Sequence, residues 1–190
     1  MALQPFICIE GLDGVGKTTI ARTLAERIGG VYYKTPPPPY DSIRQTIDLR
    51  ADPRTRFCFY LSAVGYASHQ IGQLLMTQPV VCDRYIYSTI AYHSAMDATL
   101  RSMVQAEHYL QADCPILLAA DENERMRRVC ARPRNSHDGH LETDSVFLMN
   151  VYREFRRFNL ELVDTTGLDI EAVVEGVLVR VMAKLRGKSA

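Results

Sequence analysis

The sequence predicts an α/β fold, in which a parallel sheet is flanked by helices. Five short apolar runs with strand character alternate with longer stretches of helical periodicity, which is the order expected around such a sheet. The chain has 190 residues and no obvious linker or internal repeat, so we expect residues 1–190 to form one domain. Its 22 basic residues balance 22 acidic ones, which disfavours nucleic acid or an anionic membrane as a partner.

The elements follow one another in a regular order. Each expected strand is a short apolar run, and the strands are Phe6–Glu10, Val31–Lys34, Pro79–Asp83, Pro115–Ala119 and Leu160–Asp164. The first helix is expected from near Gly16 to about Ile28, because Gly29 and Gly30 end it. Further helical patterns lie at about 53–77, 86–111, 122–131, 142–157 and 169–186.

Cysteine usage and the N-terminus bear on where the chain resides. The five cysteines are widely spaced and form no Cys-x-x-Cys pair, which argues against a disulfide framework and a zinc site. The N-terminus lacks the basic stretch and apolar run of a signal peptide, and no segment has the apolar length that spans a bilayer. We therefore expect a cytoplasmic protein.

The glycine-rich segment after the first strand carries the clearest chemical signal. Its sequence GLDGVGKT, residues 11–18, matches the P-loop pattern and stands between a strand and a helix, as that motif requires. The glycines let backbone N–H groups surround phosphate oxygens at a helix N-terminus. Lys17 is expected to reach the β- and γ-phosphates, and the Thr18 hydroxyl to ligate Mg²⁺. The residues expected to bind the nucleoside triphosphate are Gly11, Asp13, Gly14, Val15, Gly16, Lys17, Thr18 and Thr19.

A second charged motif, Asp83-Arg84-Tyr85, directly follows the third predicted strand. Asp83 is thereby placed at the carboxyl end of a buried strand, next to the P-loop strand. A carboxylate at that position can hold Mg²⁺, and an adjacent arginine can clamp an acceptor phosphate. The alternative is a surface ion pair.

The four consecutive prolines of the segment TPPPPY, residues 35–40, favour a stiff, extended chain. The segment is either a rigid loop or a wall of the acceptor pocket with a cis bond. Its position after the second strand favours the pocket, with Pro36 as the candidate contact. Arg44, on the helix expected after this loop, is either a second phosphate contact or a surface arginine.

Basic residues crowd the segment before and within a turn-rich stretch at about 130–142, which we interpret as a lid. Phosphoryl transfer needs positive charge on the transferring group and exclusion of water. The candidates for that charge are Arg128, Arg132 and Arg134. Arg125 and Arg127 are expected to lie on a solvated helix face, and His137 and His140 are interpreted as polar loop residues rather than metal ligands.

At these motifs the sequence resembles the thymidylate kinase family. Residues 6–19, FICIEGLDGVGKTT, look like the opening of that family. Residues 83–93, DRYIYSTIAYH, are similar to its Asp-Arg-Tyr motif and the following Ser-x-x-Ala-Tyr-Gln, with His93 in place of Gln. The resemblance implies a five-stranded parallel sheet, a homodimer, and transfer of a phosphoryl group from MgATP to dTMP.

The resemblance also implies roles for individual residues. It places Asp13 near the acceptor sugar and the transferring phosphate, Arg84 on the acceptor phosphate, and Tyr92 in the nucleoside pocket. Thr89 is a further candidate for acceptor binding. The expected catalytic residues are Lys17, Asp13, Arg84, Asp83, Arg128, Arg132 and Arg134, and Thr18 and Asp83 are expected to hold the metal. The P-loop has Gly14 where some thymidylate kinases carry an arginine.

The acceptor base is where the sequence departs from the family pattern. The family has Phe-x-x-x-Arg in the helix before Asp-Arg-Tyr, and an ungapped count from Asp83 matches Phe59 to the stacking Phe but Ala63 to the Arg. Phe59 is therefore either a base platform or a buried helix residue. Two alternatives to a dTMP kinase stay open: a kinase of another nucleotide or small phosphorylated metabolite, and a nucleotide-binding module without turnover.

Overall fold

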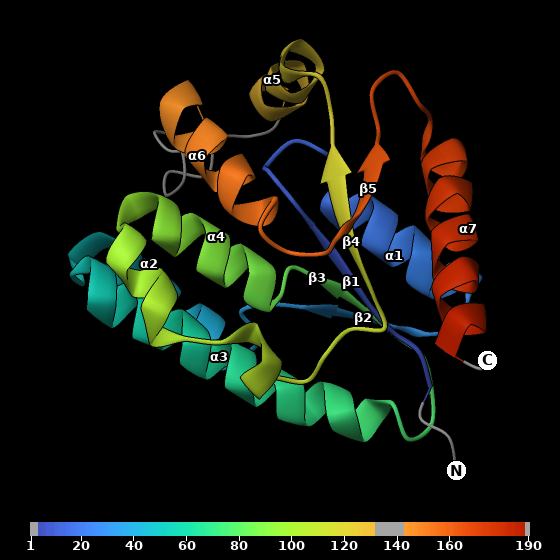
Figure 1. Cartoon of the computed structure of the whole chain (residues 1–190), viewed down its shortest axis with the longest axis horizontal. Coiled ribbons are helices and arrows are strands. Elements are labelled where there is room, and N and C mark those ends of the chain that lie inside the picture. The colour runs from blue at the N-terminus through green and yellow to red at the C-terminus, as the bar shows by residue number, and fades with distance from the viewer. Residues whose placement is uncertain (1–3, 132–142, 189–190) are drawn as a thin grey trace.

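The computed structural model describes residues 4–131 and 143–188 of the chain. Five parallel strands form one sheet with the spatial order β2-β3-β1-β4-β5 (Figure 1). The strands are β1 (Phe6–Gly11), β2 (Val31–Lys34), β3 (Val80–Asp83), β4 (Cys114–Ala119) and β5 (Glu161–Asp164). The predicted α/β fold with a five-stranded parallel sheet is confirmed.

Helices cover both faces of this sheet. They are α1 (Lys17–Arg27), α2 (Tyr40–Arg50), α3 (Pro53–Leu74), α4 (Ile86–Met96), α5 (Glu122–Cys130), α6 (Ser145–Phe155) and α7 (Ile170–Lys188). Helices α1 and α7 pack on one face, whereas α3, α4 and α6 pack on the other (Figure 1). Helix α5 lies beyond the carboxyl ends of β4 and β5.

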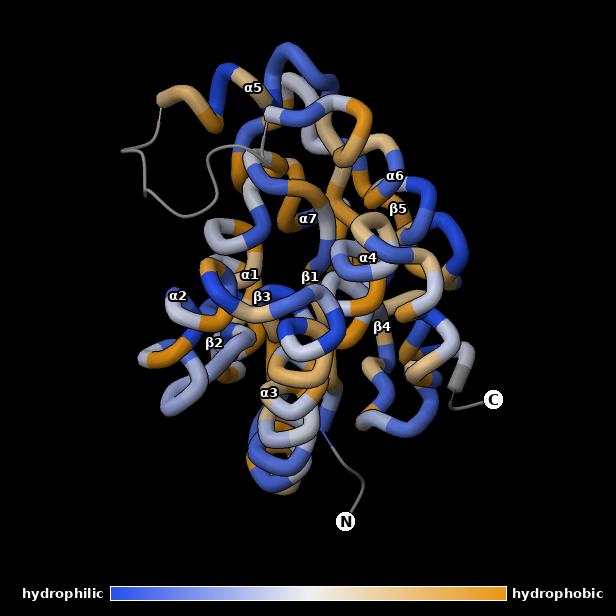
Figure 2. Tube along the Cα trace, turned by 90° about the vertical axis from the view of Figure 1, so that its left-hand side faces the viewer, coloured by the Kyte–Doolittle hydropathy of each residue, from blue (hydrophilic) through white to orange (hydrophobic). Residues whose placement is uncertain are grey.

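The central strand β1 is buried on both sides. Phe6 and Cys8 pack into the cluster under α3, α4 and α6, whereas Ile7 and Ile9 pack into the cluster under α1 and α7. Because each face needs an apolar side chain, such a strand reads as a continuous apolar run. Figure 2 shows the hydrophobic segments gathered mostly in the interior, between the two helix layers.

The helix expected over 86–111 is wrong in its extent, because α4 ends at Met96. Asp97 takes an extended conformation, and its side chain accepts a hydrogen bond of 2.9 Å from the backbone N–H of Thr99. Two short 3₁₀ turns follow, at Ala98–Met103 and Ala106–His108. Asp caps a new turn by this bond and so competes with helix continuation.

Two other segments complete the fold. Helix α2 is the helix that we expected after the proline segment, where the bonds Thr35–Pro36 and Pro38–Pro39 are both cis. Within residues 4–131 and 143–188, no helix has the length and apolar character needed to cross a membrane.

The strand order brings the two predicted motifs together. Strand β3 lies directly beside β1, and in the parallel register Asp83 is the partner of Ile9. The carboxyl end of β3 therefore lies beside the loop that follows β1. In open α/β sheets, ligands bind beyond the carboxyl ends of the strands.

Candidate active site

The P-loop has the backbone geometry that its glycines predict. Gly14 and Gly16 adopt φ angles of 93° and 96°, in the left-handed region that favours glycine. Helix α1 begins at Lys17 without a side-chain cap on its first N–H groups. These unpaired N–H groups make the start of α1 suited to bind an anion.

Three charged side chains meet at this loop. The Lys17 ammonium is buried and donates hydrogen bonds to the Leu12 carbonyl at 2.7 Å and to Asp13 Oδ1 at 3.4 Å. The same Asp13 oxygen accepts a hydrogen bond from Arg84 Nη2. The structure thus brings together the three residues predicted to act on the transferring phosphate and the acceptor phosphate.

The surroundings lower the pKa of both Asp13 and Lys17, for different reasons. Burial by itself would raise the pKa of Asp13, but Arg84 and Lys17 together hold that pKa well below its ordinary value. Burial and the neighbouring Arg84 lower the pKa of Lys17 to about 8, against the opposing carboxylates. Asp13 is therefore ionised at neutral pH, and Lys17 loses its proton more readily than an ordinary lysine.

Asp83 and Thr18, the two residues predicted to hold the metal, lie beside each other. The Thr18 hydroxyl donates a 2.6 Å hydrogen bond to Asp83 Oδ2, and Asp83 is buried. No cluster of three or more metal-binding side chains occurs in the part of the chain that the structure describes. One hydroxyl beside one carboxylate fits Mg²⁺, which usually takes few protein ligands together with substrate phosphates and water.

Arg84 is held in an unusual backbone conformation. Its φ angle is 66°, in the left-handed region, and its N–H donates to the Ile9 carbonyl at 3.0 Å. The next residue, Tyr85, donates its N–H to the buried carboxylate of Glu10 at 2.9 Å, and Ser88 donates both its N–H and its hydroxyl to the same group. Glu10 therefore anchors the start of α4 to the P-loop strand.

Tyr92 joins the cluster from α4. Its hydroxyl donates to Asp13 Oδ2 at 3.3 Å, and its ring lies 5.3 Å from the Arg84 guanidinium carbon. Thr89, one turn earlier, is buried, and its carbonyl accepts a 2.8 Å hydrogen bond from His93 Nδ1. His93 itself lies between Phe57 and Tyr60 of α3 and helps to pack α4 on α3.

The remaining acceptor candidates lie around α2 and α3. Phe59 is partly exposed and packs its ring 5.6 Å from Tyr40. Arg44 donates to Asp48 at 3.3 Å and to the Tyr60 hydroxyl at 2.9 Å, and so ties α2 to α3. These contacts do not reach Asp13, and the roles of Phe59 and Arg44 as acceptor contacts stay predictions.

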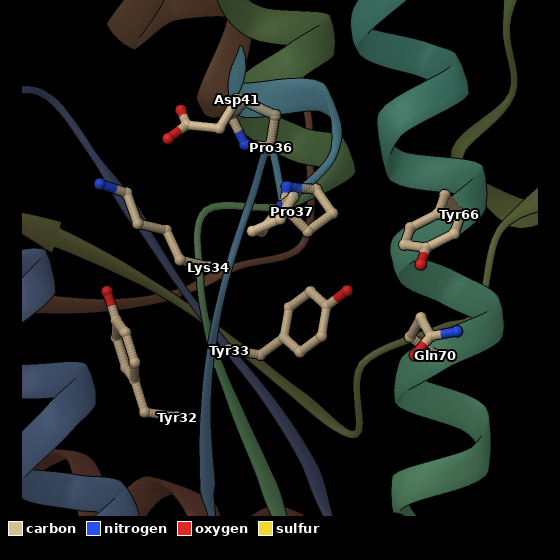
Figure 3. A pocket seen from close by; sticks show the side chains of 9 residues that line it. Tyr32, Tyr33, Lys34, Pro36, Pro37, Asp41, Tyr66 and Gln70 are labelled. Atoms are coloured by element: carbon tan, nitrogen blue, oxygen red, sulfur yellow. The ribbon is translucent and has the colours of Figure 1, made fainter.

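Pro36 lines a cavity of about 360 Å³ beside the edge strand β2. Figure 3 shows Tyr33, Tyr66 and Gln70 on one side of this strand, with Tyr32 and Lys34 on the other. The Tyr32 hydroxyl also donates to Asp83 Oδ2 at 3.1 Å, so the cavity adjoins the carboxylate that we predicted to hold the metal. Burial raises the pKa of Tyr32 to about 12, which keeps that hydroxyl a donor at neutral pH.

The structure corrects the interpretation of Arg125. We expected a solvated side chain, but Arg125 is 1% exposed and its Nη1 donates to the Asp13 carbonyl at 3.0 Å. Arg127 does lie on the solvated face, paired with Glu124. The periodicity of this short basic helix could not show which of the two arginines is buried. Arg125 is buried because α5 packs on the P-loop, and its contact with Asp13 joins residues 112 positions apart.

Of the three arginines predicted to act in the lid, only Arg128 lies among the residues that the structure describes. Arg128 donates to Glu124 and to Thr165, in the loop after β5, and these bonds do not reach Asp13. Arg132 and Arg134 lie outside the described residues, as do His137, His140 and nearly all of the lid expected at about 130–142. The assignment of a lid arginine stays a prediction.

Sequence reasoning missed Glu10, Tyr32 and Arg125 as residues of this site. A signal existed for Glu10, because a carboxylate inside an apolar strand must find buried donors. No comparable signal existed for Tyr32, which comes from the edge strand. Its role depends on the pairing of β2 with β3, which only the assembled sheet reveals.

Comparisons with known proteins agree with this geometry. The model of the family described as "Thymidylate kinase" matches residues 9–175. A probable thymidylate kinase of Methanocaldococcus jannaschii is 28% identical over 174 residues, covering 88% of this chain and 90% of that protein. A probable thymidylate kinase of Pyrococcus abyssi is 28% identical over 200 residues, covering 96% and 98%.

Solved structures show the same fold at lower identity. A thymidylate kinase from Candida albicans superposes with a TM-score of 0.78 at 20% identity, covering 96% of this chain and 93% of that one. A deoxyadenosine kinase from M. mycoides gives a TM-score of 0.64 at 18% identity, covering 94% and 99%. At these identities the solved structures support the fold alone, and the match to the family model shows the family.

Proposed function

The chain belongs to the thymidylate kinase family and is an ATP-dependent phosphotransferase, and we propose that it transfers the γ-phosphoryl group of ATP to the phosphate of dTMP. One observation carries the proposal at the level of chemistry. Arg84, the candidate acceptor-phosphate clamp, and Lys17, the P-loop lysine, contact the same oxygen of Asp13. A group that binds the acceptor and a group that binds the donor are therefore held next to each other.

The reaction requires positioning and charge more than covalent chemistry by the protein. An oxygen of the acceptor phosphate attacks the γ-phosphorus, the bond from that phosphorus to the β,γ-bridging oxygen breaks, and ADP leaves with the bond electrons. Lys17 and the P-loop N–H groups bind the donor phosphates, and Arg84 orients the acceptor phosphate. Asp13 fixes the guanidinium of Arg84 and the ammonium of Lys17 relative to each other.

Thr18 and Asp83 would hold Mg²⁺, which when bound neutralises charge on the β- and γ-phosphates. The 2.6 Å hydrogen bond between them supports this assignment, since it places a hydroxyl oxygen beside a buried carboxylate. We propose that Arg132 and Arg134, with Arg128 in a supporting role, complete the positive charge around the transferring group. A homodimer and a cytoplasmic location are further proposals, taken from the family resemblance and the sequence.

A second acceptor is favoured by the environment of α3. Ala63, where the ungapped match expects the base-reading arginine, is 1% exposed and carries no donor. The neighbouring face of α3 instead presents Phe59 and Tyr66, both packed on Tyr40. Aromatic rings stack on any base, because every base has a π-face. This surface is compatible with a nucleotide other than dTMP.

An ADP-release assay with MgATP tests the proposal. The acceptors are dTMP, dUMP, UMP, CMP, dCMP, AMP and GMP, and Arg84→Met serves as a control without the acceptor clamp. Turnover restricted to dTMP is the expected result. Turnover with another monophosphate would reassign the acceptor, whereas ATP binding without turnover on any acceptor would overturn the assignment as a nucleotide kinase.

A further inference from the structure

Helix α5 delivers a buried guanidinium to the main chain of the P-loop. Arg125 Nη1 donates a 3.0 Å hydrogen bond to the carbonyl oxygen of Asp13. The Nε and Nη2 atoms bind the Glu122 carboxylate at 2.8 Å and 2.7 Å. The Arg125 side chain is 1% exposed, whereas that of Glu122 is 58% exposed. The pair is therefore buried at the arginine end, against the loop.

The packing of α5 on the loop is close. A Cβ atom added to Gly14 would lie 2.8 Å from the Arg125 carbonyl oxygen, 2.9 Å from Arg125 Cγ and 2.8 Å from Val129 Cγ2. Real Cβ atoms do not approach other heavy atoms this closely. The stem of Arg125 thus fills the space where a side chain at position 14 would start, and α5 holds the loop in its observed turn.

The hydrogen bond from Arg125 restrains the peptide group between Asp13 and Gly14, which has a carbonyl at one end and an N–H at the other. The Asp13 carbonyl and the Gly14 N–H belong to the same planar unit, so a donor on the oxygen restricts the orientation of both. A charged donor also polarises that unit, and hydrogen bonds in a chain strengthen one another. Gly14 is in the segment whose N–H groups surround phosphate oxygens in P-loops. A buried guanidinium is costly to desolvate, and the bonds to the Asp13 carbonyl and the Glu122 carboxylate help to compensate for that cost.

We propose that Arg125 is a positioning residue of the phosphate-binding loop, which orients the Asp13–Gly14 peptide for the nucleotide phosphates. It acts through the backbone and through the packing of α5, and it is distinct from Lys17 and Arg84, which contact Asp13 by its side chain. The proposal rests on nucleotide binding by the P-loop, which is part of the proposed function. It does not depend on which acceptor is phosphorylated.

The test compares Arg125→Met with Arg125→Lys and with a matched control on the same helix, Arg127→Met. Arg127 is 74% exposed and pairs with Glu124, so its loss removes an equal charge without touching the loop. For each variant, ATP affinity is measured by calorimetry without any acceptor, and the melting temperature is measured without nucleotide. Omitting the acceptor separates failure of this proposal from failure of the dTMP assignment.

We expect Arg125→Met to weaken ATP binding about 10- to 100-fold, the range for losing a hydrogen bond to a charged group. Arg125→Lys should recover part of this loss, since an ammonium still provides one donor, and Arg127→Met should bind within about twofold of wild type. A lower melting temperature with unchanged ATP affinity would reduce Arg125 to a packing residue and overturn the proposal. If Arg125→Met does not fold, Arg125→Leu replaces it as the variant without a donor, and unchanged ATP affinity in that variant would overturn the proposal equally.

Discussion

The carboxylate of Glu10, near the end of strand β1 and just before the P-loop, accepts a 2.9 Å hydrogen bond from the backbone N–H of Tyr85, at the start of α4. The bond joins two motifs that are 75 positions apart in sequence. Glu10 is fully buried, and Tyr85 directly follows Arg84, whose backbone is in the left-handed region. The conformation that points Arg84 at Asp13 is thereby tied to the strand that carries the P-loop.

Glu10→Ala should destabilise the protein strongly. The substitution leaves the N–H groups of Tyr85 and Ser88 without their acceptor, and each unpaired buried donor costs about 1–3 kcal/mol. We expect the free energy of unfolding, measured by urea denaturation, to fall by about 2–6 kcal/mol. Glu10→Gln is the matched control, because its amide oxygen can still accept both bonds. Equal stability of Glu10→Ala and wild type would contradict this role.

Arg84→Met should affect the acceptor more than the donor. Removing the guanidinium takes away the proposed clamp on the acceptor phosphate, and bonds to charged groups contribute about 1.5–3 kcal/mol, or roughly 10- to 100-fold in affinity. We expect the KM for the acceptor to rise by about that factor in steady-state kinetics, with ATP affinity by calorimetry changed much less. A loss confined to ATP affinity would place Arg84 on the donor side instead.

Binding of ATP should weaken above about pH 8. Burial and Arg84 lower the pKa of Lys17 to about 8 in the free protein, so its ammonium is lost above that pH. The effect of pH on folding stability has the opposite sign. Between about pH 8 and the ordinary lysine pKa, Lys17 is protonated more often in the unfolded chain than in the folded one. The contribution of Lys17 to folding stability therefore rises with pH. ATP titrations from pH 6.5 to 9.5 measure the first effect. In Lys17→Met that pH dependence should disappear, and its persistence there would assign it to another group.

Tyr32→Phe should weaken the use of Mg²⁺. The hydroxyl donates to the same Asp83 oxygen that accepts from Thr18, so its loss frees the carboxylate to rotate. We expect the Mg²⁺ concentration for half-maximal rate to rise by about 3- to 30-fold, and the affinity for MgATP by calorimetry to fall in parallel. Tyr33→Phe is the control, because Tyr33 lies on the opposite side of β2 (Figure 3). Equal effects of the two substitutions would contradict a specific contact with Asp83.

Much of this molecule follows from local sequence. Apolar runs located all five strands within one or two residues. The P-loop and the Asp83-Arg84 motif supplied the residues predicted to handle phosphate, and the structure brings these residues together. The prediction was weakest where the local pattern is ambiguous. Helix α4 is buried on most of its surface, so its apolar residues give no clear end, and Asp97 ends it through a capping bond.

The sequence by itself determined the sheet, the nucleotide-binding loop and the identity of the charged residues, because strand periodicity and the glycine pattern act over a few neighbouring residues. Only the tertiary structure decided which side chains complete the site. Tyr32 reaches Asp83 because β2 pairs with β3, and Arg125 reaches Asp13 because α5 packs on Gly14. These contacts join residues 51 and 112 positions apart, and their formation depends on how the whole chain packs around one core.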